Sequence, residues 1–143
     1  ISDQVHFAYE KFSKGLRGKT PGGLYTLSDA YAHARACTYF STYEGFGNAF
    51  VEAVLAKTPI FVNDYKPVFW QEIGSKGFQT VLLENNHLTD EKVQQMKEVI
   101  YNDTLNREIG EYNYKLGKKH FSYEVLENKL KELLRRVGKN FQK

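Results

Sequence analysis

Two carboxylates and a glycine-rich turn form the part of the sequence best suited to chemistry. Glu44 lies in the turn, and Glu52 follows eight positions later. Gly45 and Gly47 allow the backbone to approach a ligand closely, because neither residue carries a Cβ atom. Carboxylates accept paired hydrogen bonds from vicinal hydroxyl groups, and these charge-assisted bonds are stronger than neutral ones. We therefore take residues 40–53 as the candidate ligand site.

The segments on either side of the turn predict how it is held. Residues 36–41 form an apolar run typical of a buried strand, and Asn48 is a suitable N-cap for a helix over residues 49–56. Ligands in open parallel sheets bind where a strand ends and the next helix begins. The free N–H groups and the positive dipole end of that helix favour a diphosphate. The expected ligand is thus an anion that lies against the start of the helix.

Glutamates at the same spacing also occur elsewhere in the chain. Glu124 and Glu132 lie within a predicted amphipathic helix, where they belong to a solvated face. The alternative for Glu44 is a surface-loop carboxylate, and the alternative for Glu52 is a first-turn helix charge stabilised by the dipole. The strand, turn and helix around Glu44 favour a ligand site over these alternatives.

The remaining elements predict an α/β fold. Further strands are expected over residues 5–9, 59–63 and 78–83, and a glycine-rich loop over residues 15–23. The other predicted helices are one capped by Thr26 or Ser28, one over residues 67–71, one from Thr89, one over residues 104–117 that ends at Gly117, and one from Ser122. Apolar strands that alternate with helices indicate a parallel sheet covered on both faces. We predict one domain, residues 1–143, with a partial Rossmann-like, doubly wound sheet of about four parallel strands.

The last predicted helix carries a continuous apolar stripe, which we expect to pack on another surface. Its residues are Val125, Leu126, Leu130, Leu133, Leu134 and Val137. Association of two copies through such a surface is a further prediction. Elsewhere, Phe69 and Trp70 are expected in the core. Residues 63–66 follow a strand, and Asn63, Asp64 and Lys66 form either a solvated loop or contacts with the ligand.

Composition narrows the class of protein. Hydrophobic residues make up 41% and charged residues 26% of the 143 positions, which is typical of a globular domain. The net charge of +3 is too small and dispersed to indicate nucleic-acid binding. The single cysteine, Cys37, excludes an internal disulfide and favours a reducing compartment. We expect a cytoplasmic location, with peripheral contact at the inner membrane face as an alternative. The histidines are scattered and no Asp-x-Asp occurs, so neither a metal nor a cofactor is predicted.

At these residues the sequence resembles the retaining glycosyltransferases that include glycogen synthase, sucrose-phosphate synthase and bacterial mannosyltransferases. The matched positions are Tyr31, Ser41, Glu44-Gly45-Phe46-Gly47, Glu52-Ala53, Pro59 and Phe121-Ser122, which span most of the chain. The resemblance implies the C-terminal half of a family 4, group 1 enzyme of the GT-B fold. It also implies a nucleotide-diphosphate sugar as donor and a sugar or lipid as acceptor.

The resemblance also implies a role for each site residue. Glu44 is expected to be the catalytic residue that contacts hydroxyl groups of the donor sugar, and Glu52 to bind the ribose. The donor-binding residues of the turn are Gly45, Phe46, Gly47, Asn48 and Ala49, whose backbone amides face the diphosphate. Family members transfer the hexosyl group with retention and without a covalent enzyme intermediate, so the carboxylate-pair rules for glycoside hydrolases do not apply.

The chain departs from the family pattern at some points. Phe40 and Lys57 replace a proline and a glycine at scaffold positions. The basic pair that holds the diphosphate, and the groups that bind the acceptor, come from upstream segments in the family, and Arg17 and Lys19 do not match that pair. We therefore expect a truncated piece of an enzyme that is inactive alone. The alternatives are a non-catalytic binding or interaction module that keeps the fold, and a signalling receiver, which needs an acidic cluster that the strand ends lack.

Overall fold

The computed structural model describes residues 25–140. The strands of this part are β1 (Cys37–Tyr39), β2 (Tyr43–Glu44), β3 (Ile60–Asn63), β4 (Lys66–Pro67) and β5 (Leu82–Leu83). The helices are α1 (Leu27–His33), α2 (Asn48–Leu55), α3 (Asp90–Tyr101), α4 (Asp103–Phe121) and α5 (Tyr123–Asn140). A π-helical turn, η3 (Phe69–Ile73), and a 3-10 turn, η4 (Gly74–Lys76), follow β4. The strand predicted at residues 5–9 and the loop with Arg17 and Lys19 lie outside the described residues.

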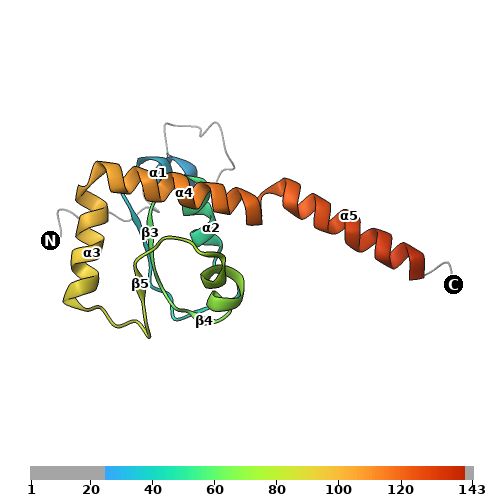
Figure 1. The fold of residues 1–143 in the computed structure, drawn as a ribbon, viewed down its shortest axis with the longest axis horizontal. Coiled ribbons are helices and arrows are strands. Elements are labelled where there is room, and N and C mark those ends of the chain that lie inside the picture. The colour runs from blue at the N-terminus through green and yellow to red at the C-terminus, as the bar shows by residue number, and fades with distance from the viewer. Residues whose placement is uncertain (1–24, 141–143) are drawn as a thin grey trace.

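Three of the strands form a parallel sheet in the order β1-β3-β5. Thr38 lies opposite Phe61, and Val62 lies opposite Leu82. β3 is buried at every position, as expected for a central strand covered on both faces. Figure 1 shows α2 and α3 on opposite sides of this strand, with α4 running across the ends of both helices. For residues 25–140, the α/β class and the parallel sheet predicted from the sequence are confirmed.

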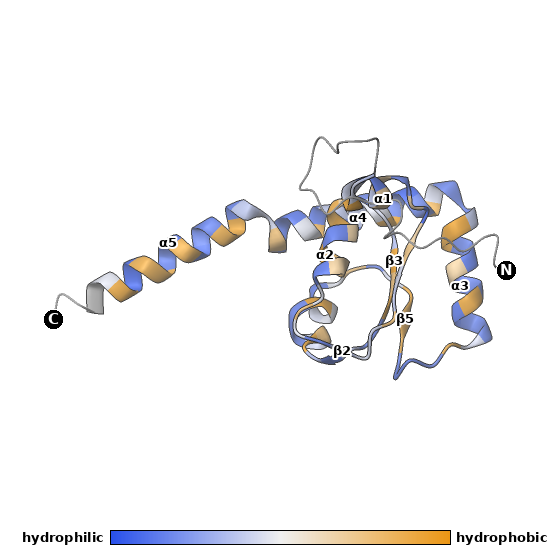
Figure 2. Ribbon diagram, turned by 180° about the vertical axis from the view of Figure 1, so that it is seen from behind, coloured by the Kyte–Doolittle hydropathy of each residue, from blue (hydrophilic) through white to orange (hydrophobic). Residues whose placement is uncertain are grey.

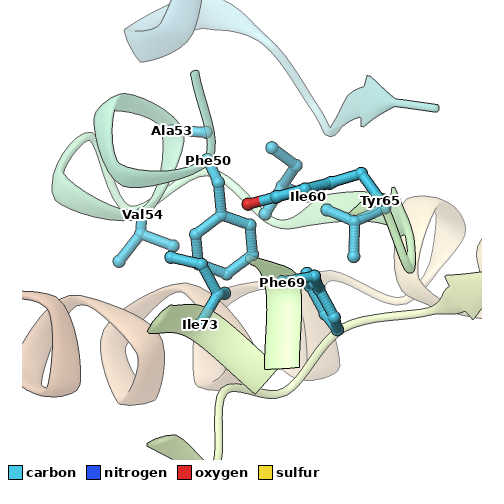
Figure 3. Packing of buried hydrophobic residues seen from close by; sticks show 8 residues of the cluster. Phe50, Ala53, Val54, Ile60, Tyr65, Phe69 and Ile73 are labelled. Atoms are coloured by element: carbon cyan, nitrogen blue, oxygen red, sulfur yellow. The ribbon is translucent and has the colours of Figure 1, made fainter. Parts of the chain in front are cut away.

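The core occupies both faces of β3. The larger cluster joins α2, β3 and η3 and is drawn in Figure 3; its buried residues are Phe50, Ala53, Val54, Ile60, Val62, Tyr65, Phe69 and Ile73. The cluster on the other face is built on Phe61, Val81 and Val99. Burying one large apolar side chain stabilises a fold by about 1.5–3 kcal/mol. These two clusters therefore hold the sheet and the start of α2 in fixed relative positions.

Close packing of α4 on α2 corrects one predicted helix end. Gly117 lies inside α4 rather than at its C-terminus. A Cβ atom at this position would approach Cγ1 of Val54 to 2.6 Å, so the glycine allows the two helices to approach. Close packing of the two helices therefore requires glycine at position 117, and α4 continues for four more residues to Phe121.

The strand predicted over residues 78–83 is shorter than expected. A side chain from α4 occupies both backbone hydrogen-bonding groups of Gln79, in its first half. Asn113 is buried, its Oδ1 accepts from the N–H of Gln79 at 2.8 Å, and its Nδ2 donates to the carbonyl of Gln79 at 2.7 Å. The ladder with β3 therefore begins only at Leu82.

The segment after β3 also differs from the prediction. Pro67 belongs to β4, which pairs in parallel with β2, and the helical turn starts two residues later at Phe69. Phe69 is buried as predicted, but the prediction for Trp70 is wrong, because 53% of its surface is exposed. Phe69 and Trp70 are neighbours on the helical turn η3, so their side chains point in different directions and only Phe69 faces the core.

Predicted helix starts at α1 and α3 are confirmed. The hydroxyl of Thr26 accepts from the N–H of Asp29 at 3.1 Å, while the Asp29 carboxylate accepts from the N–H of Thr26 at 2.8 Å. This reciprocal capping box satisfies two backbone donors that the helix leaves open. At α3 there is one capping bond, in which the hydroxyl of Thr89 accepts from the N–H of Lys92 at 3.3 Å.

The apolar stripe of α5 is exposed beyond Val125, which is half-buried at the start of the helix. Figure 1 shows α5 projecting away from the sheet, and Figure 2 shows hydrophobic residues recurring along it. Leu126, Leu130, Leu133 and Leu134 are all exposed. Beyond Val125, the expected packing is therefore absent within residues 25–140. Within these residues no helix has the length and apolar character needed to cross a bilayer.

Candidate functional site

The glycine-rich turn lies at the carboxyl end of the sheet, as predicted. It leaves β1, forms β2 and leads into α2. β2 is fixed by β4: Tyr43 lies opposite Lys66, and the N–H of Lys66 donates to the carbonyl of Thr42 at 3.0 Å. The turn is therefore attached to the segment that follows β3 and does not depend only on its own sequence.

The start of α2 differs from the prediction in one residue. The N-cap position belongs to Gly47, and Asn48 is already the first helical residue. Gly47 has a φ of 101°, which L side chains rarely adopt, and a Cβ atom there would lie 2.1 Å from the hydroxyl oxygen of Tyr65. Only glycine fits both conditions. Within the described residues α2 has no side-chain cap. The N–H of Phe50 donates to the carbonyl of Gly47 at 3.0 Å, so the N–H groups of Asn48 and Ala49 are the candidates for binding an anion.

Glu44 is a half-buried carboxylate in the turn. Hydrogen bonding with the hydroxyl of Tyr39, and to a smaller extent with that of Ser41, lowers the pKa of Glu44 below its ordinary value. Burial, followed by the interaction with Glu44, raises the pKa of Tyr39. Glu44 therefore stays ionised at neutral pH beside a protonated phenol.

Glu52 is exposed on α2 and is paired with a tyrosine of its own. Burial, together with the charge and hydrogen bonding of Glu52, raises the pKa of Tyr31 to about 12. Tyr31 lies on α1 and Tyr39 on β1, so each carboxylate is oriented by a different element. The arrangement supplies two acceptors, one on each side of the start of α2.

A hollow of about 250 Å³ lies between α1, β1 and the start of α2. Its lining residues are Leu27, Ala30, Tyr31, Ala34, Cys37, Thr38, Tyr39, Ala49 and Ile60. The two tyrosines that interact with Glu44 and Glu52 both belong to this lining. Each carboxylate therefore interacts with a tyrosine that lines the same hollow, and Ala49 in the first turn of α2 also lines it.

The other predicted site residues fall into two groups. Gly45 is exposed with open space around its Cα, Asn48 is exposed, and Ala49 lines the hollow. Gly47 is buried, and the ring of Phe46 packs edge-on against Phe121 at a centroid distance of 5.7 Å. The ring of Phe46 is therefore engaged in packing, and Gly47 has no side chain to offer a ligand.

Asn63, the last residue of β3, and Asp64 are buried, which corrects the prediction of a solvated loop for these two residues, whereas Lys66 is exposed as predicted. Asn63 is buried; its Nδ2 donates to the carbonyl of Ser41 at 2.9 Å and its Oδ1 accepts from the N–H of Asn86 at 2.6 Å. Asp64 is also buried, accepts from the N–H of Asn85 at 2.8 Å and pairs with Nζ of Lys66 at 3.3 Å. Buried polar groups of this kind need partners, and here they join the turn to the loop after β5.

Sequence reasoning missed the roles of three tyrosines, Tyr31, Tyr39 and Tyr65. A buried tyrosine usually places its hydroxyl on a partner. The position near the end of a predicted strand was an available signal for Tyr39 and Tyr65, but not for Tyr31, which lies on a helix. Their partners were not predictable, because they lie in other elements. For metal binding, no group of three His, Cys, Asp or Glu side chains gathers anywhere in residues 25–140.

Comparison with curated proteins gives two relatives, both named mannosylglucosylglycerate synthase. The protein from Thermotoga maritima is 36% identical over 110 residues, which cover 68% of this chain and 26% of that protein. The protein from Petrotoga mobilis is 47% identical over 60 residues, which cover 42% of this chain and 14% of that protein. The matched relatives are glycosyltransferases.

These matches are partial. The chain spans about a quarter or less of the length of the two relatives. No protein-family model matches the sequence, and no solved structure matches it.

Proposed function

We propose that this chain is the donor-binding part of a retaining glycosyltransferase that uses a nucleotide-diphosphate sugar. The observation that carries the proposal is an ionised carboxylate, Glu44, in a turn that leads directly into a helix with no side-chain cap in the described structure. Homology to two glycosyltransferases supports it. The same arrangement suits a donor whose sugar and diphosphate lie side by side across the helix start.

Each site group has a defined task in this proposal. Glu44 accepts hydrogen bonds from vicinal hydroxyls of the hexose, and the backbone N–H groups of residues 46–49 bind the diphosphate. Glu52 accepts from the ribose hydroxyls while Tyr31 limits its rotation. None of these contacts requires a metal ion. The diphosphate departs and the acceptor attacks from the same face, so the anomeric configuration is retained.

The names of the relatives suggest the substrates to test. Mannosylglucosylglycerate contains mannosyl, glucosyl and glycerate groups, so we propose a mannosyl donor with glucosylglycerate as acceptor, because glucosylglycerate lacks only the mannosyl group. In the family pattern the acceptor and the upstream basic groups belong to other parts of the enzyme. The tests below therefore use the full-length protein that contains this chain.

The deciding experiment measures donor binding and hexosyl transfer together. Titration calorimetry with UDP, GDP and ADP identifies the nucleotide, and transfer from GDP-mannose, UDP-glucose and ADP-glucose to glucosylglycerate identifies the reaction. We expect one nucleotide to be preferred and the product to retain the anomeric configuration. Glu52→Ala should weaken binding of that nucleotide about tenfold, since a charged acceptor of hydrogen bonds is lost.

Glu132→Ala is the matched control for Glu52→Ala. Glu132 has the same residue type, lies on α5 and forms an exposed ion pair with Arg136. Its substitution should leave nucleotide binding unchanged. Binding without transfer by the full-length protein would favour the non-catalytic module. Absence of binding to all three nucleotides would contradict the proposal itself.

A further inference from the structure

Tyr65 lies directly beneath the candidate diphosphate turn. The residue is only 1% exposed, and its hydroxyl donates to the carbonyl oxygen of Phe46 at 3.0 Å. The same hydroxyl occupies the space that a Cβ atom at position 47 would need. In Figure 3 the hydroxyl of Tyr65 points toward the helix that carries Phe50. Tyr65 therefore contacts the turn at the peptide unit between Phe46 and Gly47, just before the N-cap residue of α2.

The direction of this hydrogen bond determines where the next N–H group points. The carbonyl of Phe46 and the N–H of Gly47 belong to one planar trans peptide unit, so they point in opposite directions. Because the carbonyl points to the hydroxyl of Tyr65, the N–H of Gly47 points away from that hydroxyl. The first N–H groups of α2 follow it in the chain and have no side-chain acceptor within the described residues.

The ring of Tyr65 is itself held in place by its neighbours. It packs edge-on against Tyr39 at a centroid distance of 5.7 Å and against Phe69 at 5.2 Å. Its backbone N–H donates to the carbonyl of Asn63 at 2.8 Å, and the next residue, Lys66, donates to Thr42. The segment after β3 therefore fixes the turn at both of its ends, at Thr42 and at Phe46.

We propose that Tyr65 is a positioning residue for the diphosphate of the donor. Its hydroxyl holds the peptide unit between Phe46 and Gly47 so that the N–H groups at the start of α2 converge on one anion. Tyr65 does not touch the ligand. This inference rests on the proposed function, because it assumes that a nucleoside diphosphate binds at the turn.

The test compares a nucleoside diphosphate with its nucleoside on the full-length protein. The pair is chosen for the preferred base: UDP with uridine, GDP with guanosine or ADP with adenosine. The dissociation constant of the nucleoside divided by that of the nucleoside diphosphate measures the contribution of the phosphates. Tyr65→Phe keeps the ring and removes the hydroxyl. We expect this ratio to fall about tenfold at a temperature where both proteins are folded, since one group that orients the amides is lost. A purely structural role would leave the ratio unchanged.

Thr80→Val is the matched control. The hydroxyl of Thr80 donates to the carbonyl of Ile60 at the other end of the sheet, so the variant also removes a hydroxyl-to-carbonyl bond. It should lower the unfolding temperature without changing the ratio. An unchanged ratio for Tyr65→Phe, or an equal fall for Thr80→Val, would overturn the inference and leave the proposed function intact. Absence of diphosphate binding by the wild type would overturn both.

A second measurement uses only the wild type and applies even if Tyr65→Phe does not fold. In a ¹⁵N-labelled sample, the amide signal of Gly47 should shift on addition of the nucleoside diphosphate and stay in place with the nucleoside. A Gly47 signal that responds equally to both ligands would overturn the inference.

Discussion

The chain contains two pairs of glutamates at the same spacing, and the structure gives them different surroundings. Glu44 and Glu52 lie at the start of α2, where hydroxyl groups from β1 and α1 orient them. Glu124 and Glu132 lie on α5, which projects from the body of the described chain. Glu124 interacts with Ser122 just before its own helix, and Glu132 pairs with Arg136 one turn away. The first pair is held by tertiary structure and the second by local structure.

This difference teaches which observations distinguish a site from a surface. The pKa values of Glu44 and Glu124 are both lowered, in each case first by a hydroxyl group, so the direction of the shift does not separate them. The backbone does separate them. Gly47 is buried with a positive φ, whereas Gly138 on α5 has open space around it. The following predictions test this contrast between the two regions.

The largest expected effect is on stability, from alanine at the two glycines. Gly47→Ala should lower the free energy of unfolding by about 2–4 kcal/mol, because it combines overpacking against Tyr65 with a left-handed backbone. Gly138→Ala should raise it by about 0.5–1 kcal/mol, since alanine is the better helix former and meets no neighbour. Urea unfolding curves measure both. Equal effects of the two substitutions would show that the turn is not packed as described.

The next effect is on transfer activity, from the first glutamate of each pair. In the full-length protein, Glu44→Gln should reduce kcat/KM about 10- to 100-fold, because a neutral amide binds sugar hydroxyls less strongly than a carboxylate. Glu124→Gln should leave kcat/KM within about twofold, since exposed charges contribute little. Initial rates over a range of donor concentrations provide the measurement. Similar losses in both variants would remove the functional distinction between the pairs.

Much of the fold was predictable because local signals agreed with the tertiary structure. Apolar runs gave the positions of β1 and β3, and the caps at Thr26 and Thr89 gave the starts of α1 and α3. The turn before α2 was predictable because glycines between a strand and a helix restrict the possible geometry. The predicted role of each residue there, including Glu44 as the catalytic group, stays a prediction.

The errors arose where a distant residue decides the local structure. Gly117 resembles a helix end in the sequence, but its partner is Val54 in another helix. Asn48 is a good N-cap by type, yet Tyr65 selects Gly47 for that position. Asn63 is a residue type common in loops, yet it is buried, and its side chain forms hydrogen bonds with the turn and with the loop after β5. No pattern within a short window of sequence contains these partners.

The smallest expected effect separates the two regions by the source of their pKa shifts. Tyr39→Phe should raise the pKa of Glu44 toward its ordinary value of 4.5 and leave that of Glu124 unchanged. Ser122→Ala should raise the pKa of Glu124 and leave that of Glu44 unchanged, because Ser122 lowers the pKa of Glu124. A carboxyl whose folded-state pKa is lowered stabilises the fold above the unfolded-state pKa, and this contribution is lost as the pH falls through the folded-state value. Tyr39→Phe should therefore lose less stability than the wild type below pH 4.5.

Carbon-detected NMR titration of the two carboxyl groups measures these pKa values directly in the wild type and both variants. A shift of Glu44 in Tyr39→Phe alone would mean that the carboxylate is oriented across elements, from β1 to the turn. A shift of Glu44 in Ser122→Ala would mean that α5 reaches the turn in solution. In that case the contrast between a site held by the core and a helix that stands apart would no longer hold.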